Sequence, residues 1–410
     1  AMNFAARRSP AAPRLPFPFR PEGEAVRECL ALVKHRLDWP AAVAVARPWV
    51  EAVRAHPAPF WALESLMREY PISSQEGLAL MRLAEALLRV PDAETAVALT
   101  ADQLGRADFD GPAADGDAPH RLLASLSASA IAWSRRFLPE GAAADEVSSG
   151  VSGLAGRLGA RAVVAAAVRA IALLGRQFVL GRSIEEATRV ADSQRRSQPA
   201  LRFSYDMLGE GARTEADAER YLAAYRQALD ALAGGRAAAS PMQGDGISIK
   251  LSALFSRYED AQRDRVLAEL LPRVWTLVEA AARANLNLTL DAEESERLEL
   301  SLEVFEALAE RIASAFPAWA GFGLAVQAYQ TRACAVVDEV AAIARRHGLR
   351  FMVRLVKGAY WDTEVKRAQE AGLPGYPVFT HKHHTDASYL ACAKRMLDHA
   401  DVIYSQFATH

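Results

Sequence analysis

From about residue 196 onward, short apolar runs alternate with amphipathic helical segments, and this alternation restricts the fold more than any other feature of the sequence. Six runs are predicted to be strands, namely GISIKLSAL, LNLTLDAE, GFGLAVQAY, LRFMVRLVKG, YPVFTHK and DVIYSQFATH. Helical segments such as RACAVVDEVAAIARRHG separate most of them. Strands and helices that alternate at this spacing predict βα units and a parallel sheet.

The two faces of the predicted strands differ in polarity. In GISIKLSAL, Ser248 and Lys250 lie on the face opposite Ile249, because successive side chains of a strand point to opposite faces. An open sheet covered by helices on both sides tends to be apolar on both faces, whereas a (βα)8 barrel carries functional groups at the C-terminal ends of its strands. We therefore predict an α/β fold, a (βα)8 TIM-type barrel over residues 196–410, with about six βα units in this chain. The later runs place on the corresponding polar face Asp291, Gln327 and Arg354.

The first half of the chain is predicted to be helical. Residues 1–25, rich in Pro and Arg, are expected to form a disordered or draped arm. Apolar residues then recur at helical spacing, so residues 26–195 are predicted to form a helical arm and an α-helical domain. The most apolar stretch, GARAVVAAAVRAIALLGRQFVLG, is interrupted by three arginines. It falls short of the roughly 18 uncharged apolar residues of a membrane-spanning helix and predicts a buried helix instead.

Charge and cysteine content exclude several classes of protein. The formal net charge of −2 at pH 7 gives no electrostatic reason to expect a nucleic-acid partner. The three cysteines lie far apart and form no CxxC pair, which excludes a disulfide framework or a zinc ribbon and is typical of a reducing compartment. No GxGxxG, Walker-type or GxSxG motif is present, which disfavours a Rossmann site, a P-loop and an α/β-hydrolase triad.

Lys250 and Asp291 are expected at the C-terminal ends of neighbouring strands, close enough to form an ion pair. In one interpretation the pair is a structural salt bridge, since such networks also perturb pKa values. In the other, Asp291 holds Lys250 as a cationic anchor for a carboxylate substrate. Burying the charge of a lysine without an anionic partner costs several kcal/mol. Lys250 therefore needs either Asp291 or a substrate carboxylate beside it, and both interpretations stay open.

Arg354 is expected in the middle of a strand with its side chain inside the barrel. A structural interpretation needs a carboxylate there, for which Asp291 is the evident candidate; an anionic cofactor or a reduced, negatively charged ring is an equally good partner. The segment KGAYW then forms a loop at the strand end. Gly358 allows the backbone to approach a ligand closely, and Tyr360 and Trp361 present flat surfaces for a ring system.

The segment THKHHTD has the composition of a metal site, but its three histidines lack regular ligand spacing. No acidic ligand set converges on them, as a closed metal site would require. Thr380 and Lys382 share one face of the segment, so phosphate binding by these two residues is the favoured interpretation. No metal is predicted.

Several ordered motifs together resemble one known family. The segments RFSYDMLGEGA, ISIKLSAL, LDAEESERLELSLEVFE, GLAVQAYQ, RLVKGAYWDTEVKRAQ, YPVFTHKHHTDASYLACA and YSQFATH are similar to the proline dehydrogenase part of proline utilization A (PutA). The resemblance is dense over residues 200–410 and looser over the helical region. It implies FAD-dependent oxidation of L-proline to pyrroline-5-carboxylate, with electrons passed to a membrane quinone.

The resemblance also implies roles for individual residues. Lys250 would bind the proline carboxylate, Asp291 would position Lys250 and the substrate amine, and Tyr360 would form a wall against the substrate ring. Arg354 and Gln327 would contact the isoalloxazine ring, and Thr380 and Lys382 would hold the remainder of the cofactor. The full set of residues implied to bind FAD is Ala292, Gln327, Arg354, Val356, Gly358, Ala359, Tyr360, Trp361, Thr380, Lys382, Ala408, Thr409 and His410.

The resemblance carries expectations about the rest of the protein as well. The sequence ends at His410, at the sixth predicted strand, so two further strands and a last helix with a substrate-binding arginine pair are expected outside it, together with an aldehyde dehydrogenase part. His381 stands where the family commonly has arginine. A cytoplasmic location with peripheral association with the inner membrane is implied, and a homo-oligomer is left open. The contrasting hypothesis is a non-catalytic helical binding or assembly module with an incomplete barrel.

Overall fold

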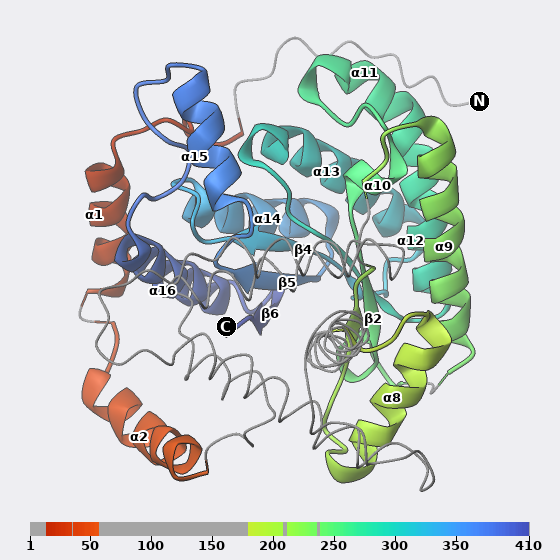
Figure 1. Ribbon diagram of the computed structural model, residues 1–410, viewed down its shortest axis with the longest axis horizontal. Coiled ribbons are helices and arrows are strands. Elements are labelled where there is room, and N and C mark those ends of the chain that lie inside the picture. The colour runs from red at the N-terminus through yellow and green to blue at the C-terminus, as the bar shows by residue number, and fades with distance from the viewer. Residues whose placement is uncertain (1–13, 35, 57–178, 208–210, 236–237, 410) are drawn as a thin grey trace, which may run out of the picture. The chain divides into compact units, whose positions relative to one another are not determined.

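The computed structural model describes residues 14–34, 36–56, 179–207, 211–235 and 238–409 (Figure 1). The chain divides into two compact units, one formed by residues 1–39 and 188–410 and the other by residues 40–187. Helix α2 (Trp39–Ala55) lies almost entirely in the second unit. The helical prediction for residues 57–178 falls outside the described residues.

Six parallel strands form one sheet in the order in which they occur along the chain. Each strand pairs with the next in sequence, and a helix connects them on the outer face, so the sheet is one part of a barrel (Figure 1). The predicted parallel βα architecture is confirmed as a six-stranded half-barrel. The strands are β1 (Ser204–Tyr205), β2 (Gly246–Ile249), β3 (Asn287–Leu290), β4 (Phe322–Gln327), β5 (Phe351–Val356) and β6 (Ile403–Phe407).

The connecting helices follow the strands in order. The longer ones are α8 (Ile184–Ser197), which precedes β1, and α9 (Glu215–Ala233), α12 (Leu271–Arg283), α13 (Leu298–Ala315), α14 (Ala333–His347), α15 (Trp361–Glu370) and α16 (Lys382–Asp398). Shorter elements are η1 (Pro241–Gln243), α10 (Leu251–Leu254), η2 (Asp260–Gln262), α11 (Arg263–Arg265), the π-helical turn η3 (Val266–Leu270) and η4 (Ser295–Arg297). Helix α9 begins with a capping box in which Thr214 and Asp217 satisfy each other's backbone N–H groups.

Two strand predictions differ from the structure. The segment YPVFTHK is not a strand, and its prediction was wrong: Val378 makes an isolated antiparallel bridge with Gln330, and α16 begins at Lys382. Val378 and Phe379 are buried in a connection that covers the loop after β4, so their burial comes without sheet pairing. The opposite error concerns β1, which lies within RFSYD and has only two residues, too few for an alternating pattern to be recognised.

The core lies between the sheet and the outer helices. Phe305 of α13 stacks on Phe322 of β4, with ring centroids 4.8 Å apart, and meets Phe351 of β5 edge to face at 4.7 Å. All three rings are fully buried. Burying a side chain of this size contributes about 1.5–3 kcal/mol, so this aromatic cluster fixes α13 against the middle of the sheet.

Helix α1 (Glu22–Val33) packs against α16, far from it in sequence (Figure 1). Ala25 and Cys29 of α1 share a buried cluster with Phe379 and Ala391. Preceding α1, Leu15 is only 4% exposed, which anchors the segment that leads into the helix. Residues 14–25 lie in the same compact unit as the barrel, and the predicted domain bounds stay a prediction.

All three cysteines meet beneath α1, although they are distant in sequence. Cys29 lies in the buried cluster just described, with Cys334 packed against it. The sulfur atoms of Cys334 and Cys392 are 3.6 Å apart, and all three thiols are free. Cysteine is among the most frequently buried residue types and packs as a small apolar side chain, which is the role these three have in seating the arm.

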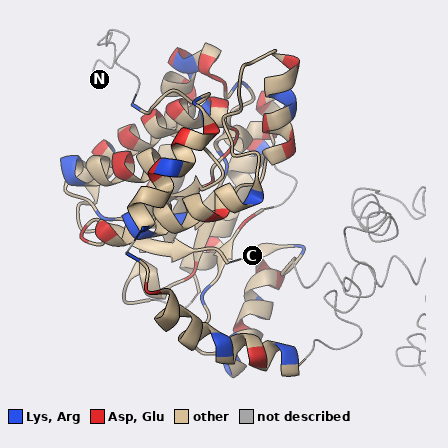
Figure 2. Ribbon diagram, turned by 90° about the vertical axis from the view of Figure 1, so that its left-hand side faces the viewer, with Lys and Arg blue, Asp and Glu red and all other residues tan. Residues whose placement is uncertain are grey.

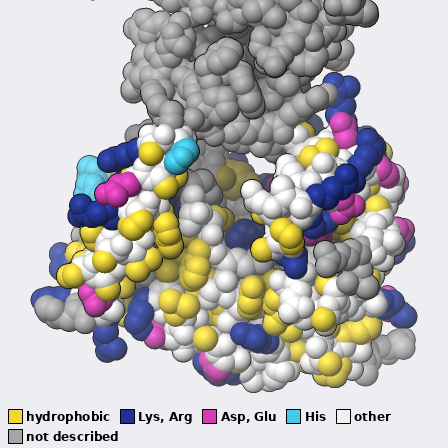
Figure 3. Space-filling view, turned by 90° about the horizontal axis from the view of Figure 1, so that it is seen from below, with side chains coloured by type: hydrophobic (Ala, Val, Ile, Leu, Met, Phe, Trp, Pro, Cys, Tyr) yellow, Lys and Arg dark blue, Asp and Glu magenta, His cyan; other side chains and the backbone are white. Residues whose placement is uncertain are grey.

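The surface of the described residues carries charges of both signs, interspersed over the helices (Figure 2). Among these residues, none of the helices combines the length and apolar character needed to cross a membrane. Apolar side chains are also visible at the surface, among the charged ones, on the face shown in Figure 3. Large exposed apolar residues of α2 are Trp39, Val43, Val45, Trp49, Val50 and Val53.

The β4–β5 pairing leads to a prediction about Gly323. A Cβ atom at this position would overlap the backbone carbonyl of Met352 on β5, and a backbone atom cannot move aside cheaply. Gly323→Ala should destabilise the barrel by about 1–3 kcal/mol, which corresponds to a Tm lower by roughly 2–10 °C. Gly234→Ala is the matched control, because its Cβ has ordinary contacts and its backbone is helical. Equal Tm values for the two variants would contradict the close approach.

Candidate active site

Lys250 and Asp291 form an ion pair at the C-terminal ends of adjacent strands. Ile249 of β2 is paired with Leu290 of β3, so the residues that follow them lie side by side. Lys250 Nζ is 2.9 Å from Asp291 Oδ2, and the predicted ion pair is therefore present. The lysine side chain is 20% exposed and the aspartate side chain 15%, so both charges are largely withdrawn from water.

Asp206 is a second carboxylate beside the same lysine. It follows β1 directly and places Oδ1 3.2 Å from Lys250 Nζ. Its side chain is 41% exposed, more than that of Asp291. Asp206 was not predicted, because the two-residue strand before it is too short to show an alternating pattern. Its position at the end of an RFSY run was the available signal.

Arg354 lies on the inner face of the sheet, as its place in the strand pattern predicts. Its guanidinium donates to Ser248 Oγ at 2.9 Å and to Ser204 Oγ at 2.6 Å. It also lies 3.6 Å from Asp291 Oδ1. The carboxylate required by the structural interpretation of Arg354 is thus present, and two strand hydroxyls hold the arginine in place.

Electrostatics within this cluster are dominated by burial. Burial raises the pKa of Asp291, and the nearby charge of Asp206 acts in the same direction, while Lys250 and Arg354 oppose the rise. Among the described residues, Lys250 and Arg354 therefore share one small, partly dehydrated region with the carboxylates of Asp206 and Asp291. Such an arrangement can bind a small zwitterion, because the cations match a carboxylate and the carboxylates match an ammonium group.

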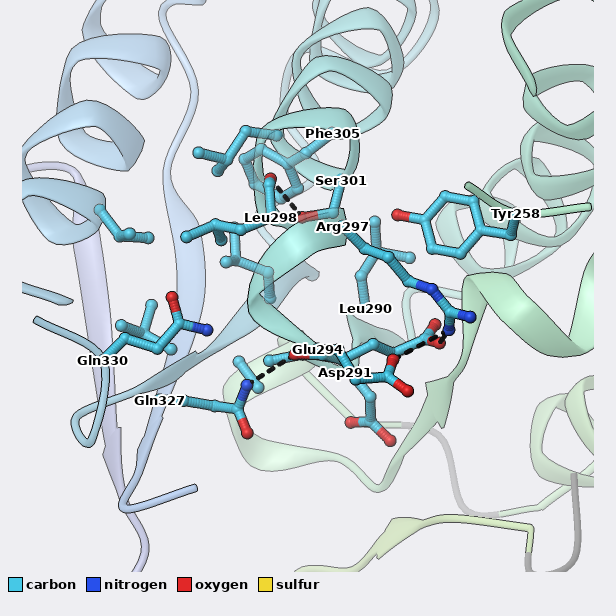
Figure 4. Close-up of a pocket in the computed structure, with 17 residues that line it drawn as sticks. Tyr258, Leu290, Asp291, Glu294, Arg297, Leu298, Ser301, Phe305, Gln327 and Gln330 are labelled. Carbon is cyan, nitrogen blue, oxygen red and sulfur yellow. Dashed lines mark hydrogen bonds and ion pairs between the residues drawn. The ribbon is translucent and has the colours of Figure 1, made fainter. Parts of the chain in front are cut away.

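Gln327 joins the loops that follow β3 and β5. Its Nε2 donates to Glu293 O at 2.8 Å (Figure 4), and its Oε1 accepts from Ala359 N at 3.2 Å. The side chain is buried, so these two bonds hold both ends of the amide. In this structure Gln327 thus positions two loops, and its implied contact with a flavin stays a prediction.

A small cavity lies behind the Asp291 loop, between the sheet and α13 (Figure 4). Ala292 and Gln327 line it on the side of the sheet. On the other side, Arg297 pairs with Glu293 at 2.7 Å and with Glu294 at 3.0 Å, and its guanidinium lies 5.5 Å from the centroid of the Tyr258 ring. These contacts hold the acidic segment after β3 in a fixed path.

Glu364 provides a further tie to that segment. Both of its carboxylate oxygens accept from Ser295, one from the backbone N–H at 2.6 Å and one from the hydroxyl at 2.7 Å. Glu364 is 4% exposed, and burial raises its pKa. Arg332, equally buried, donates to Ser295 O at 3.1 Å. Helix α15 is thereby fastened to the loop that carries Asp291.

The GAYW segment leads from β5 into α15, whose first residue is Trp361. Gly358 has φ of 141°, and a Cβ there would overlap the ring of Tyr329, so a protein side chain already makes the close approach that was expected of a ligand. Tyr360 is the N-terminal flanking residue of α15; burial, together with Glu293, raises its pKa to about 12. Trp361 donates to Phe379 O at 2.9 Å and remains 42% exposed, which leaves a flat aromatic surface available.

Of the remaining predicted residues, Thr380 and Lys382 lie at the start of α16. Thr380 bonds to the carboxylate of Glu22, and Lys382 pairs with Asp386 at 2.8 Å. Ala408 O accepts from the Tyr389 hydroxyl at 2.8 Å. Val356 ends β5, Thr409 is exposed, and His410 falls outside the described residues.

Comparison with known proteins defines the class. The family model described as proline dehydrogenase matches residues 189–410, more than half of the chain. The chain therefore belongs to the proline dehydrogenase family. A second model, described as the DNA-binding domain of proline dehydrogenase, matches residues 62–178. That stretch has fewer basic than acidic residues and is not described by the structure, so the expectation of no nucleic-acid partner stays a prediction.

Individual relatives are bifunctional PutA proteins. The chain is 43% identical over 351 residues to bifunctional protein PutA of Escherichia coli strain K12, covering 85% of this chain and 26% of that protein. It is 42% identical over 378 residues to the PutA of Rhizobium meliloti, covering 90% and 29%. The chain thus spans little more than a quarter of the length of these relatives.

Solved structures of proline utilization A are also similar to this chain. A mutant of Bradyrhizobium japonicum proline utilization A has a TM-score of 0.68 and 43% identity, covering 98% of this chain and 39% of that one. Another structure is of proline utilization A with proline bound in remote sites; its TM-score is 0.68 and its identity 43%, with coverage of 97% and 40%. The fold and family predicted from the sequence motifs are both confirmed.

The buried tie between Glu364 and Ser295 predicts a pH dependence. Because the pKa of Glu364 is raised in the folded state, its contribution to stability is fully present below the ordinary glutamate value and is lost as pH rises through the raised pKa. The stability advantage of wild type over Glu364→Gln should therefore shrink as pH rises from about 4 through the raised pKa of Glu364. Thermal unfolding over this range measures it. Glu370→Gln, at the exposed end of α15, is the control, and a constant difference for Glu364→Gln would disprove the effect.

Proposed function

We propose that this chain contains the site for FAD-dependent oxidation of L-proline to pyrroline-5-carboxylate. Membership of the proline dehydrogenase family supports the reaction class. The observation that carries the proposal is the cluster of Lys250, Asp206 and Asp291 at the C-terminal ends of the strands, with Arg354 beside them on the inner face of β5. Catalytic groups of barrel enzymes lie at this end.

Proline fits the cluster as a zwitterion. Lys250 would bind the proline carboxylate. That carboxylate would replace Asp206 more easily than Asp291, because Asp206 is the more exposed of these two partners. Asp291 would keep the lysine in place and lie near the substrate amine. Tyr360, in the adjacent loop, would form an apolar wall beside the pyrrolidine ring. Fixing both charged ends orients the carbon that loses hydride, and orientation of this kind supplies a large part of many rate enhancements.

The residues present also fit a flavin. A partly buried arginine faces the inside of the half-barrel, and an exposed indole face lies on the neighbouring loop. When bound, FAD would supply the hydride acceptor. Arg354 would stabilise negative charge at the inner face. The residues proposed to hold the cofactor are Ala292, Gln327, Arg354, Val356, Gly358, Ala359, Tyr360, Trp361, Thr380, Lys382, Ala408, Thr409 and His410.

The proposal extends to the protein's partners on the strength of the family resemblance. The electron acceptor would be a membrane quinone, and the protein would be cytoplasmic with peripheral association with the inner membrane. Assembly as a homo-oligomer is part of the same proposal. A flavin absorption spectrum of the purified protein would separate the enzyme from a non-catalytic assembly module, which would be colourless.

Arg354→Met should weaken FAD retention in the complete protein that contains this chain. The substitution removes charge-assisted contacts worth about 1.5–3 kcal/mol, so FAD affinity should fall roughly 10- to 150-fold. Titration of the apoprotein with FAD measures the loss. Arg350→Met, just before the same strand but exposed, should bind FAD normally. Wild-type retention and wild-type reduction by proline in Arg354→Met would show that this arginine does not serve the flavin.

Lys250→Met should raise the KM for proline and also lower kcat, since the anchor both binds and orients the substrate. Asp291→Ala should act in the same direction by releasing the lysine. Steady-state kinetics with proline and an artificial electron acceptor provide the measurement. Lys366→Met, on the exposed surface of α15, serves as the control. Unchanged proline kinetics in both site variants would leave the pair as a structural salt bridge.

A further inference from the structure

The carboxylate of Glu22 occupies the start of helix α16. Thr380 donates to it through its backbone N–H at 2.9 Å and through its hydroxyl at 2.7 Å. His384 Nδ1 lies 2.6 Å from the same carboxylate. One side chain of the arm thus takes both hydrogen-bond donors of Thr380, a residue 358 positions away in sequence.

The packing of α1 against the barrel unit places Glu22 beside Thr380. Glu22 is in the first turn of α1, one turn before Ala25, which is buried with Phe379 and Ala391. Burial acts to raise the pKa of Glu22, but the bonds from His384 and Thr380 outweigh it and hold that pKa below its ordinary value. The group is therefore an anion, bound at the N-terminal end of a 17-residue helix, where the helix dipole favours negative charge.

The same donors are the ones proposed to bind FAD. A carboxylate and a phosphate are both anionic hydrogen-bond acceptors, and the single N–H and the single hydroxyl hydrogen of Thr380 cannot serve both fully. The two lysines nearby are held in turn by another acid: Asp386 accepts from Lys357 at 2.7 Å and from Lys382 at 2.8 Å. Two acidic side chains of the protein, Glu22 and Asp386, therefore already bind the groups at this end of α16 that could otherwise bind a phosphate.

We propose that Glu22 competes with a phosphate group of FAD for Thr380, so that the arm helix α1 regulates cofactor binding. The inference rests on the proposed FAD-dependent function. Its consequence is reciprocal: seating of the α1 first turn weakens FAD binding, and FAD loosens the α1 first turn by the same factor.

The test is a titration of the apoprotein that contains this chain with FAD and, separately, with riboflavin, followed by flavin fluorescence. Glu22→Gln removes the competing charge, and FAD should bind about tenfold more tightly, the factor expected if Glu22 fills the position in roughly nine molecules of ten. Riboflavin has no phosphate, and its affinity should not change. Glu24→Gln is the matched control, since Glu24 lies in the same turn but is exposed.

Hydrogen exchange supplies the reciprocal measurement. In wild type, FAD should accelerate exchange in the α1 backbone, while riboflavin should leave it unchanged. Equal FAD affinities of wild type and Glu22→Gln would overturn the inference but leave the function intact. Weaker FAD binding by Glu22→Gln, or equal tightening for both ligands, would overturn it too. Failure of every variant to bind FAD would reject the proposed function, and the inference with it.

Discussion

The parallel register of β2 and β3 is the constraint on which the site depends. Pairing of Ile249 with Leu290 sets Lys250 beside Asp291, and Arg354 then has a carboxylate to approach. A slip of one residue would turn Lys250 to the opposite face, among the apolar helices. An unpaired charge buried there costs several kcal/mol. The requirement to keep these charges together therefore stabilises the same register that forms the site.

Much of this arrangement could be predicted because it depends on local periodicity. Alternation in β2 through β5 identified the inner face, and with it Lys250, Asp291 and Arg354. Two segments have no periodicity that could predict their structure. Asp206 follows a strand of two residues, which is too short to alternate. The segment around Val378 is buried, as a strand would be, yet it pairs with nothing beyond one bridge.

Other parts of the site depend on tertiary contacts that no local pattern encodes. Glu364 and Ser295 lie 69 residues apart, and each alone has the appearance of an ordinary polar residue at a helix start. Glu22 is equally unremarkable in sequence, since acids are common in the first turn of a helix. These side chains meet their partners only because the fold brings the loops after β3 and β5 together and packs α1 against α16. Sequence motifs thus predicted the charged residues of the site, whereas the contacts that hold the surrounding loops in place could be identified only from the fold.

The docking of α1 on α16 also has a consequence for biosynthesis. Glu22 leaves the ribosome long before Thr380, which is 358 residues later. At typical elongation rates of about 5–20 residues per second, Thr380 is synthesised roughly 20 to 70 seconds after Glu22. Throughout that interval the apolar side chains of α1 have no barrel surface to cover them. Until α16 has been synthesised, α1 therefore lacks the helix against which its buried residues Ala25 and Cys29 pack.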